Sequence, residues 1–144
     1  MTSRPILLIE DDFDDKVFLE EVFSELNVQN PIVWFETCNE AKKFILSSKE
    51  QMFIILCDIN MPGKSGIEFK REIDASMELR EKSIPFIFYT TTANQDYVNE
   101  AYRKLTVQGF FQKSHDFEKT KKDIKLIMDY WSSCIHPNSK ALYA

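Results

Sequence analysis

The sequence predicts an α/β fold built around a doubly wound, five-stranded parallel sheet. Short apolar runs alternate with segments of helical periodicity along the whole chain, which is the pattern of successive strand-helix-strand units. The chain has 144 residues, of which 44% are hydrophobic, enough for one core of ordinary size. We therefore expect one domain over residues 4–136, followed by a short tail at 137–144 and no output domain.

Five apolar runs are expected to form the strands. In chain order they are residues 6–9, 32–35, 53–56, 85–89 and 109–111. Ile, Leu and Phe dominate these runs, as in strands that are buried on both faces of a sheet. The last run is the weakest, because it begins with Gly and holds only two apolar residues.

Each strand is followed by a segment whose apolar residues recur at spacings of three and four, which indicates a helix with one buried face. In chain order these residues are Leu19, Phe23 and Leu26; Ala41, Phe44 and Ile45; Phe69 and Ile73; Tyr97, Val98, Ala101, Tyr102 and Leu105; and Phe117, Ile124, Ile127, Met128 and Trp131. Connections are short except for residues 77–83, which we expect to be a charged extension between the third helix and the fourth strand.

Composition excludes several classes of protein. No stretch reaches the roughly 18 apolar residues of a membrane span, and the N-terminus does not look like a signal peptide, so we expect a cytoplasmic protein. A net charge of −5 argues against nucleic acid as a partner, since such binding depends on Lys and Arg. Cys38, Cys57 and Cys134 lack the paired spacing of a zinc or redox site and are expected to be reduced thiols in or near the core.

Asp58 is the most informative position. It ends the apolar run 52–57 and precedes Pro62 and Gly63. Parallel α/β sheets bind their ligands at the carboxyl ends of strands, where Asp58 is expected to lie. An isolated Asp after a strand is more often only a turn residue, so the interpretation depends on the other strand ends.

Five of the six residues in the segment 10–15, after the first strand, are acidic. In a doubly wound sheet the end of the first strand lies beside the end of the third, so Glu10 and Asp11 can approach Asp58. Three such carboxylates repel one another unless a hard cation neutralises them, which predicts a Mg²⁺ site. The remaining acids are interpreted as favourable charges at a helix N-terminus: Asp12, Asp14 and Asp15.

Two further strand ends carry matching chemistry. Thr90 ends the fourth strand and Lys113 follows the fifth. With Mg²⁺ they would supply donors and positive charge for the oxygens of a phosphoryl group that is transferred to Asp58. A bound flavin or dinucleotide is not expected, because the acids after the first strand would repel its phosphates.

Together these strand ends resemble those of the response-regulator receiver domain of bacterial two-component phosphorelays, over residues of roughly 4–136. The resemblance implies a flavodoxin-like (βα)5 fold with strand order 2-1-3-4-5. It also implies these roles: Asp58 as phosphoacceptor, Asp11 as direct metal ligand, Glu10 as ligand through water, Asn60 as the position whose backbone carbonyl binds Mg²⁺, Thr90 as switch hydroxyl, Phe110 as aromatic switch, and Lys113 as the lysine that contacts the phosphoryl group.

Within the family, the chain is most similar to stand-alone receivers that serve phytochrome-like or other orphan histidine kinases. The features that carry this likeness are Leu79-Arg80 ahead of Ile84-Pro85, Thr90-Thr91, and Asp129-Tyr130-Trp131. The resemblance implies a histidine kinase as one partner and a downstream protein that binds the face of the fourth helix, fifth strand and fifth helix.

Several residues are candidates for that partner-binding face, although aromatic residues at such spacing are more often core residues or semi-exposed packing residues. They are Tyr97, Tyr102, Leu126 and Tyr130. A homodimer through the last helix and tail, at Trp131 and Leu142, is left open.

One departure from the family pattern concerns Lys113. The family usually follows this lysine with a proline in a cis peptide, and here Ser114 stands instead. A cis bond before a residue other than proline is costly, so a trans bond and a different aim of Lys113 are open possibilities.

Two rival functions are weighed against a signalling phosphoacceptor that catalyses only its own modification. A phosphatase of the haloacid dehalogenase type also uses a nucleophilic Asp with Mg²⁺, but it needs a second Asp two positions later, where this chain has Asn60. A receiver-like module that acts by binding alone is disfavoured by the intact Asp11, Asp58, Thr90 and Lys113.

Overall fold

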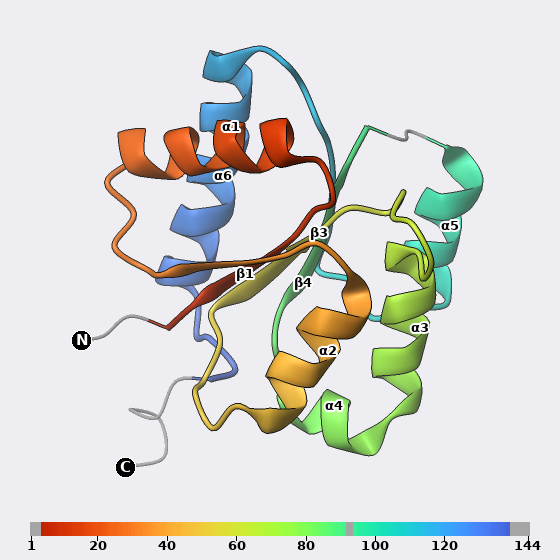
Figure 1. Ribbon diagram of the computed structural model, residues 1–144. Helices are drawn as coiled ribbons and strands as arrows, with labels where there is room; N and C mark the ends of the chain where they lie inside the picture. The colour runs from red at the N-terminus through yellow and green to blue at the C-terminus, as the bar shows by residue number, and fades with distance from the viewer. Residues whose placement is uncertain (1–3, 92–93, 139–144) are drawn as a thin grey trace.

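Five parallel strands form the sheet of the computed structural model, which describes residues 4–91 and 94–138 (Figure 1). The strand order is β2-β1-β3-β4-β5, so the predicted fold class and strand order are confirmed. The strands are β1 (Ile6–Ile9), β2 (Ile32–Phe35), β3 (Ile54–Cys57), β4 (Phe86–Thr90) and β5 (Gly109–Gln112).

In the described residues, six helices connect the strands or follow them. They are α1 (Phe13–Glu25), α2 (Cys38–Ser47), α3 (Gly66–Ala75), α4 (Met77–Glu81), α5 (Gln95–Arg103) and α6 (Phe117–Ser133). The predicted fourth and fifth helices are therefore α5 and α6. Leu26 and Leu105, which were expected in helices, lie just beyond the ends of α1 and α5.

The expectation for residues 77–83 was wrong, because this segment contains the short helix α4. Ser76 caps the helix by accepting a hydrogen bond from the Leu79 N–H at 3.3 Å. Leu79 is buried in the core and anchors the turn. A helix of five residues with one buried side chain shows no apolar repeat, so periodicity could not reveal it.

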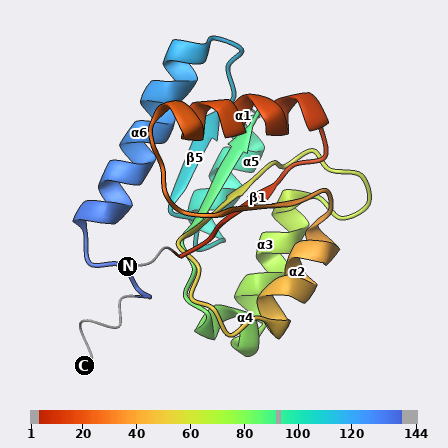
Figure 2. The same cartoon turned by 60° about the vertical axis from the view of Figure 1, so that its left-hand side comes forward.

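The helices cover both faces of the sheet (Figure 2). The helices α1 and α6 lie on one face, and α2, α3 and α5 lie on the other. Successive strand residues point to opposite faces, so Ile6 and Leu8 pack on the α1 and α6 side, whereas Leu7 and Ile9 pack on the other. This double burial explains why the central strands are apolar at every position.

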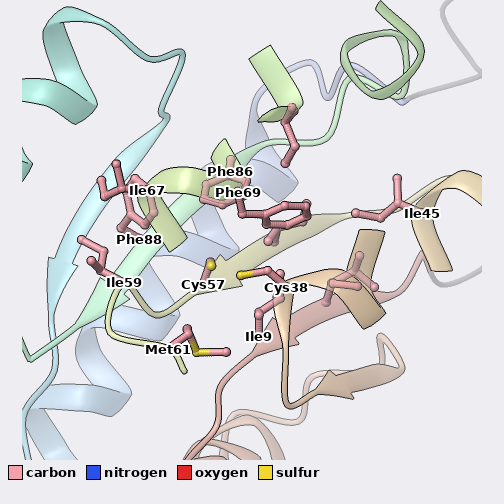
Figure 3. Close-up of a cluster of buried hydrophobic side chains, with 14 of the residues drawn as sticks. Ile9, Cys38, Ile45, Cys57, Ile59, Met61, Ile67, Phe69, Phe86 and Phe88 are labelled. Carbon is pink, nitrogen blue, oxygen red and sulfur yellow. The ribbon is translucent and has the colours of Figure 1, made fainter. Parts of the chain in front are cut away.

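The core on the α2 and α3 side contains a group of aromatic rings and two thiols (Figure 3). Phe69 and Phe88 are fully buried, and both contact the ring of Phe86. Cys38 and Cys57 are free thiols buried in the same cluster, while Cys134 is free and half-buried at the end of α6.

The segment that follows α6 is tied to the amino-terminal edge of the sheet. The His136 ring stacks on Phe53 with a centroid separation of 5.1 Å, and its Nε2 lies 2.5 Å from the Phe53 carbonyl oxygen. The Arg4 guanidinium donates to the Asn138 carbonyl at 2.9 Å. Leu142, one of the two residues considered for a dimer, lies outside the described residues. In residues 4–91 and 94–138 no helix has the length and apolar character needed to cross a membrane.

Candidate functional site

The carboxyl ends of four strands meet at one edge of the sheet. The parallel register places Ile9 beside Cys57, Cys57 beside Phe88, and Thr90 beside Gln112. Four residues therefore come to one site, called the pocket: Glu10, Asp58 and Lys113, which directly follow β1, β3 and β5, and Thr90, the last residue of β4. The arrangement follows from the topology, because parallel strands present their carboxyl ends on the same side.

Three carboxylates predicted from the sequence come together at this edge. Ligand oxygens of Glu10, Asp11 and Asp58 all lie within 4.8 Å of one another. Glu10 is 1% exposed and Asp58 is 7% exposed, whereas Asp11 is exposed to solvent. The Asp58 N–H donates to the Ile9 carbonyl at 3.0 Å, which fixes the two loops to each other. Such a set of oxygen ligands suits a hard divalent cation.

Lys113 lies in the same pocket and contacts its carboxylates. Its ammonium group lies 2.9 Å from Asp58 Oδ2 and 3.0 Å from Asp15 Oδ2, and it also forms an ion pair with Glu10. The Lys113 N–H donates to the Thr90 carbonyl at 2.8 Å, so the backbone on both sides of the pocket is joined. The described residues include no cis peptide bond, and Lys113 therefore reaches Asp58 with a trans bond to Ser114.

Asp15 is a pocket residue that sequence reasoning missed. It was interpreted only as a helix N-terminal acid, yet its carboxylate is one of the three that contact Lys113. A signal was present, because Asp15, Leu19 and Val22 are spaced as i, i+4 and i+7, and the latter two are buried. The helix face that packs on the sheet therefore also carries Asp15. Asp12 does cap α1, accepting from the Asp15 N–H at 3.1 Å.

The electrostatics of the pocket show a shortage of positive charge. Burial raises the pKa of Glu10 to about 7, with the nearby Asp58 charge acting in the same direction and Lys113 only partly opposing it. Burial alone would lower the pKa of Lys113, but its contacts with Glu10 and Asp58 outweigh burial and raise this pKa above its usual value. A divalent cation would relieve the remaining repulsion among the carboxylates.

The loop after Asp58 depends on close backbone packing. The Asn60 N–H donates to Asp58 Oδ1 at 3.3 Å, and Asn60 itself is exposed. The Gly66 N–H donates to the Ile59 carbonyl at 3.0 Å, where α3 begins. A Cβ atom on Gly66 would lie only 2.2 Å from the Asp58 carbonyl oxygen, so this position requires glycine.

The two predicted switch residues lie on neighbouring strands. Thr90 is the last residue of β4 and is fully buried at the pocket edge. Phe110 is half-buried on β5, with its ring centroid 5.7 Å from that of Phe88. Phe110 thus packs against the core on the α2 and α3 side.

The four residues considered for partner binding are not equally accessible. Tyr102 on α5 and both Leu126 and Tyr130 on α6 have more than half of their surface exposed. Tyr97 instead packs against the core beneath α5. Packing against the core therefore describes Tyr97, whereas a role of the other three in partner binding stays a prediction.

Comparisons with known proteins agree with this geometry. The sequence profile of the response regulator receiver domain matches residues 6–125. Response regulator Rcp1 of Synechocystis sp. (strain ATCC 27184 / PCC 6803 / Kazusa) is 29% identical over 133 residues, covering 89% of this chain and 88% of Rcp1.

Two solved structures with this fold are also similar in sequence. The phosphorylated cyanobacterial phytochrome response regulator RcpA matches with a TM-score of 0.82 at 26% identity, covering 95% of this chain and 100% of that chain. The Mn²⁺-bound form of Rcp1 matches with a TM-score of 0.79 at 27% identity, covering 93% of this chain and 99% of that chain. The sheet order, the acidic edge and these matches lead to one conclusion: the chain belongs to the response regulator receiver domains, the phosphoacceptor signalling domains of two-component systems.

Proposed function

We propose that this chain is a single-domain response regulator that accepts a phosphoryl group from a histidine kinase onto Asp58. The observation that carries the proposal is the pocket in which Glu10, Asp11 and Asp58 lie together and Lys113 contacts Asp58. The domain would span residues 4–136 with a short tail after it.

The pocket would hold Mg²⁺ through the carboxylates of Asp11 and Asp58, the Asn60 backbone carbonyl, and Glu10 acting through water. Mg²⁺ keeps several waters and accepts few protein ligands, which fits a set with one exposed and two buried carboxylates. When bound, the ion supplies positive charge to the oxygens of the phosphoryl group. Rcp1, a relative of this chain, has been crystallised with Mn²⁺ bound.

The residues of the pocket would have different roles in phosphoryl transfer. A carboxylate oxygen of Asp58 attacks phosphorus, and the bond from phosphorus to the histidine nitrogen of the donor breaks. Lys113, already 2.9 Å from Asp58 Oδ2, moves onto an oxygen of the transferred group and balances its charge. The buried Thr90 at the edge of the pocket would donate its hydroxyl to the same group.

The phosphorylated state would be recognised on the surface formed by α5, β5 and α6. Thr90 is the last residue of β4, next to the pocket, and Phe110 lies on β5, which is part of that surface. The exposed Tyr102, Leu126 and Tyr130 would contact a downstream protein or a second copy of the chain. The likeness to RcpA supports a phytochrome-like kinase as the donor. The transfer would take place in the cytoplasm.

Incubation of the protein with Mg²⁺ and acetyl phosphate tests the proposal. We expect one phosphoryl group per chain by intact mass, none in Asp58→Asn, and normal modification in Asp14→Asn, an exposed acid of α1 outside the pocket. Modification that persists in Asp58→Asn would contradict the assignment of the phosphoacceptor.

The same experiment separates the two rival functions. Steady consumption of acetyl phosphate would favour a haloacid-dehalogenase-like phosphatase, although Asn60 offers no carboxylic acid to protonate a leaving group. No modification and no consumption in the wild type would favour a module that acts by binding alone.

A further inference from the structure

The indole of Trp34, on β2, donates a hydrogen bond to the backbone of the acidic loop. Trp34 Nε1 lies 2.7 Å from the carbonyl oxygen of Glu10. The pairing of β1 with β2 ends at Ile9 and Phe35, and the Glu10 N–H still donates to the Phe35 carbonyl at 3.0 Å. The next carbonyl lies beyond the ladder, and a side chain of β2 takes the place of a backbone donor there.

The indole is itself held by the first turn of α1. The Phe13 ring meets it edge to face, with centroids 6.0 Å apart. The Lys16 ammonium lies 4.9 Å from the centroid of the Trp34 ring and 5.3 Å from that of Phe13. Phe13 is 59% exposed, so burial in the core does not explain its position. The cluster of Phe13, Lys16 and Trp34 therefore links β2 to the start of α1 across the acidic loop.

Asp11 is the pocket acid that depends most on this link. The carboxylate of Glu10 is held by Lys113 and by the Asp12 N–H at 3.1 Å, whereas that of Asp58 is held by Lys113 and Asn60. The described residues contribute no hydrogen bond or ion pair to the Asp11 carboxylate. The point from which this carboxylate extends is therefore set by the backbone alone, and the Glu10 carbonyl belongs to the peptide unit that joins Glu10 to Asp11.

We propose that Trp34 is a positioning residue for the metal pocket: its indole N–H fixes the Glu10–Asp11 peptide and so aims the Asp11 carboxylate at the cation. This inference rests on the proposed function, since it concerns the Mg²⁺ that the function requires. Holding a ligand in place before the ion arrives removes part of the ordering cost of binding, and groups that orient ligands commonly change metal affinity when they are lost.

The two tryptophans of the chain provide a matched pair of substitutions. Trp34→Phe keeps an aromatic ring against Phe13 and Lys16 but removes the N–H. Trp131→Phe makes the same change at the other end of the molecule, where Trp131 packs edge to face against His136. Calorimetric titration with Mg²⁺ should give a Kd about 3- to 10-fold higher in Trp34→Phe than in wild type, and no change in Trp131→Phe.

Two further readouts separate positioning from general destabilisation. Phosphorylation of Trp34→Phe by acetyl phosphate should be slow at low Mg²⁺ and should return to the wild-type rate at saturating Mg²⁺, which a misfolded protein would not do. In Trp131→Phe, Trp34 is the remaining tryptophan, and its emission should change with Mg²⁺ along a saturable curve. If Trp34→Phe does not fold, Phe13→Leu can replace it, because Phe13 is exposed. This variant should also raise the Mg²⁺ Kd, by a smaller factor.

The inference would be overturned if the Mg²⁺ Kd of Trp34→Phe were within twofold of wild type. It would also be overturned if the Trp34 emission did not change on addition of Mg²⁺. If Asp58 still accepts a phosphoryl group in that case, the proposed function stands. If the wild type neither binds Mg²⁺ nor becomes phosphorylated, both the inference and the proposed function are wrong.

Discussion

Two lysine side chains are buried at opposite edges of the same sheet, and they differ in the number of carboxylates that they contact. At the amino-terminal edge, Lys70 is 4% exposed and lies 2.9 Å from one carboxylate, that of Asp74. It also lies 3.1 Å from the Thr106 hydroxyl and 5.2 Å from the centroid of the Phe86 ring. At the carboxyl-terminal edge, Lys113 contacts three carboxylates, and a fourth, Asp11, lies in the same cluster.

The comparison teaches how a structural ion pair differs from a binding pocket. Burial lowers the pKa of Lys70, and its single partner Asp74 only partly opposes that effect. The same burial acts on Lys113, but the surplus of carboxylates reverses it and raises the pKa. In a pair with matched charges, such as Lys70 and Asp74, the charges balance without a ligand. A cluster with excess negative charge is stabilised by binding a cation.

The largest expected effect comes from replacing each lysine by methionine. Lys113→Met should lower the rate of phosphorylation by acetyl phosphate by about 100-fold, because it removes a charge that contacts the transferred group. Lys70→Met should keep the wild-type rate but lower the free energy of unfolding by about 3 kcal/mol, because Asp74 loses its buried partner. Single-turnover phosphorylation and urea unfolding measure the two quantities. Equal loss of rate in both variants would remove the distinction between the two edges.

A second test compares neutral replacements of one acid at each edge. Glu10→Gln should raise the free energy of unfolding of the metal-free protein by about 2 kcal/mol, because it removes a buried charge from a crowded cluster. Asp74→Asn should lower it by about 2 kcal/mol, since Asp74 accepts from the Thr106 N–H and hydroxyl as well as from Lys70. Urea unfolding near pH 8 with a chelator measures both. A lower or unchanged free energy of unfolding in Glu10→Gln would mean that excess charge does not destabilise the metal-free pocket.

Much of the fold could be predicted because its signals are repeated along the chain. The runs around residues 6–9 and 53–57 are apolar at every position, which in an α/β pattern means a strand buried on both faces. The short helix α4 could not be predicted, because its order comes from one buried side chain, Leu79, and one cap, Ser76.

The candidate site was predictable where topology decides it. Glu10, Asp11 and Asp58 follow strands, and parallel strands bring such residues to one edge whatever the side chains between them. Trp34 was not predicted, because its contact depends on which way a side chain points from a half-buried strand. Asp15 was interpreted only as a helix N-terminal acid, although its spacing from Leu19 and Val22 indicates the helix face that packs on the sheet. The contact of Lys113 with Asp58 also required the structure, since the chain lacks the proline that usually follows this lysine.

The smallest expected effect is on the pH dependence of stability at the amino-terminal edge, where the buried His136 ring is neutral. The Asn138 N–H donates to His136 Nδ1 at 2.9 Å, so that nitrogen carries no proton and Nε2 donates to the Phe53 carbonyl. The charged group that faces the ring is Arg4, whose guanidinium lies 3.2 Å from Nδ1, while Phe53 and Trp131 pack on the ring without charge. Burial, followed by the Arg4 charge, lowers the pKa of His136.

Because this lowered pKa belongs to the folded state, the unfolded chain binds more protons as the pH falls. The stabilisation by His136 is therefore complete above its usual pKa of 6.5 and is lost progressively as the pH falls below that value. Between about pH 6.5 and 5.5 we expect the wild type to lose about 1 kcal/mol per pH unit relative to His136→Gln, which keeps hydrogen-bonding atoms but does not titrate. Urea unfolding of both proteins between about pH 7.5 and 5.5 measures the difference. Parallel pH profiles of the two proteins would show that His136 contributes no such dependence.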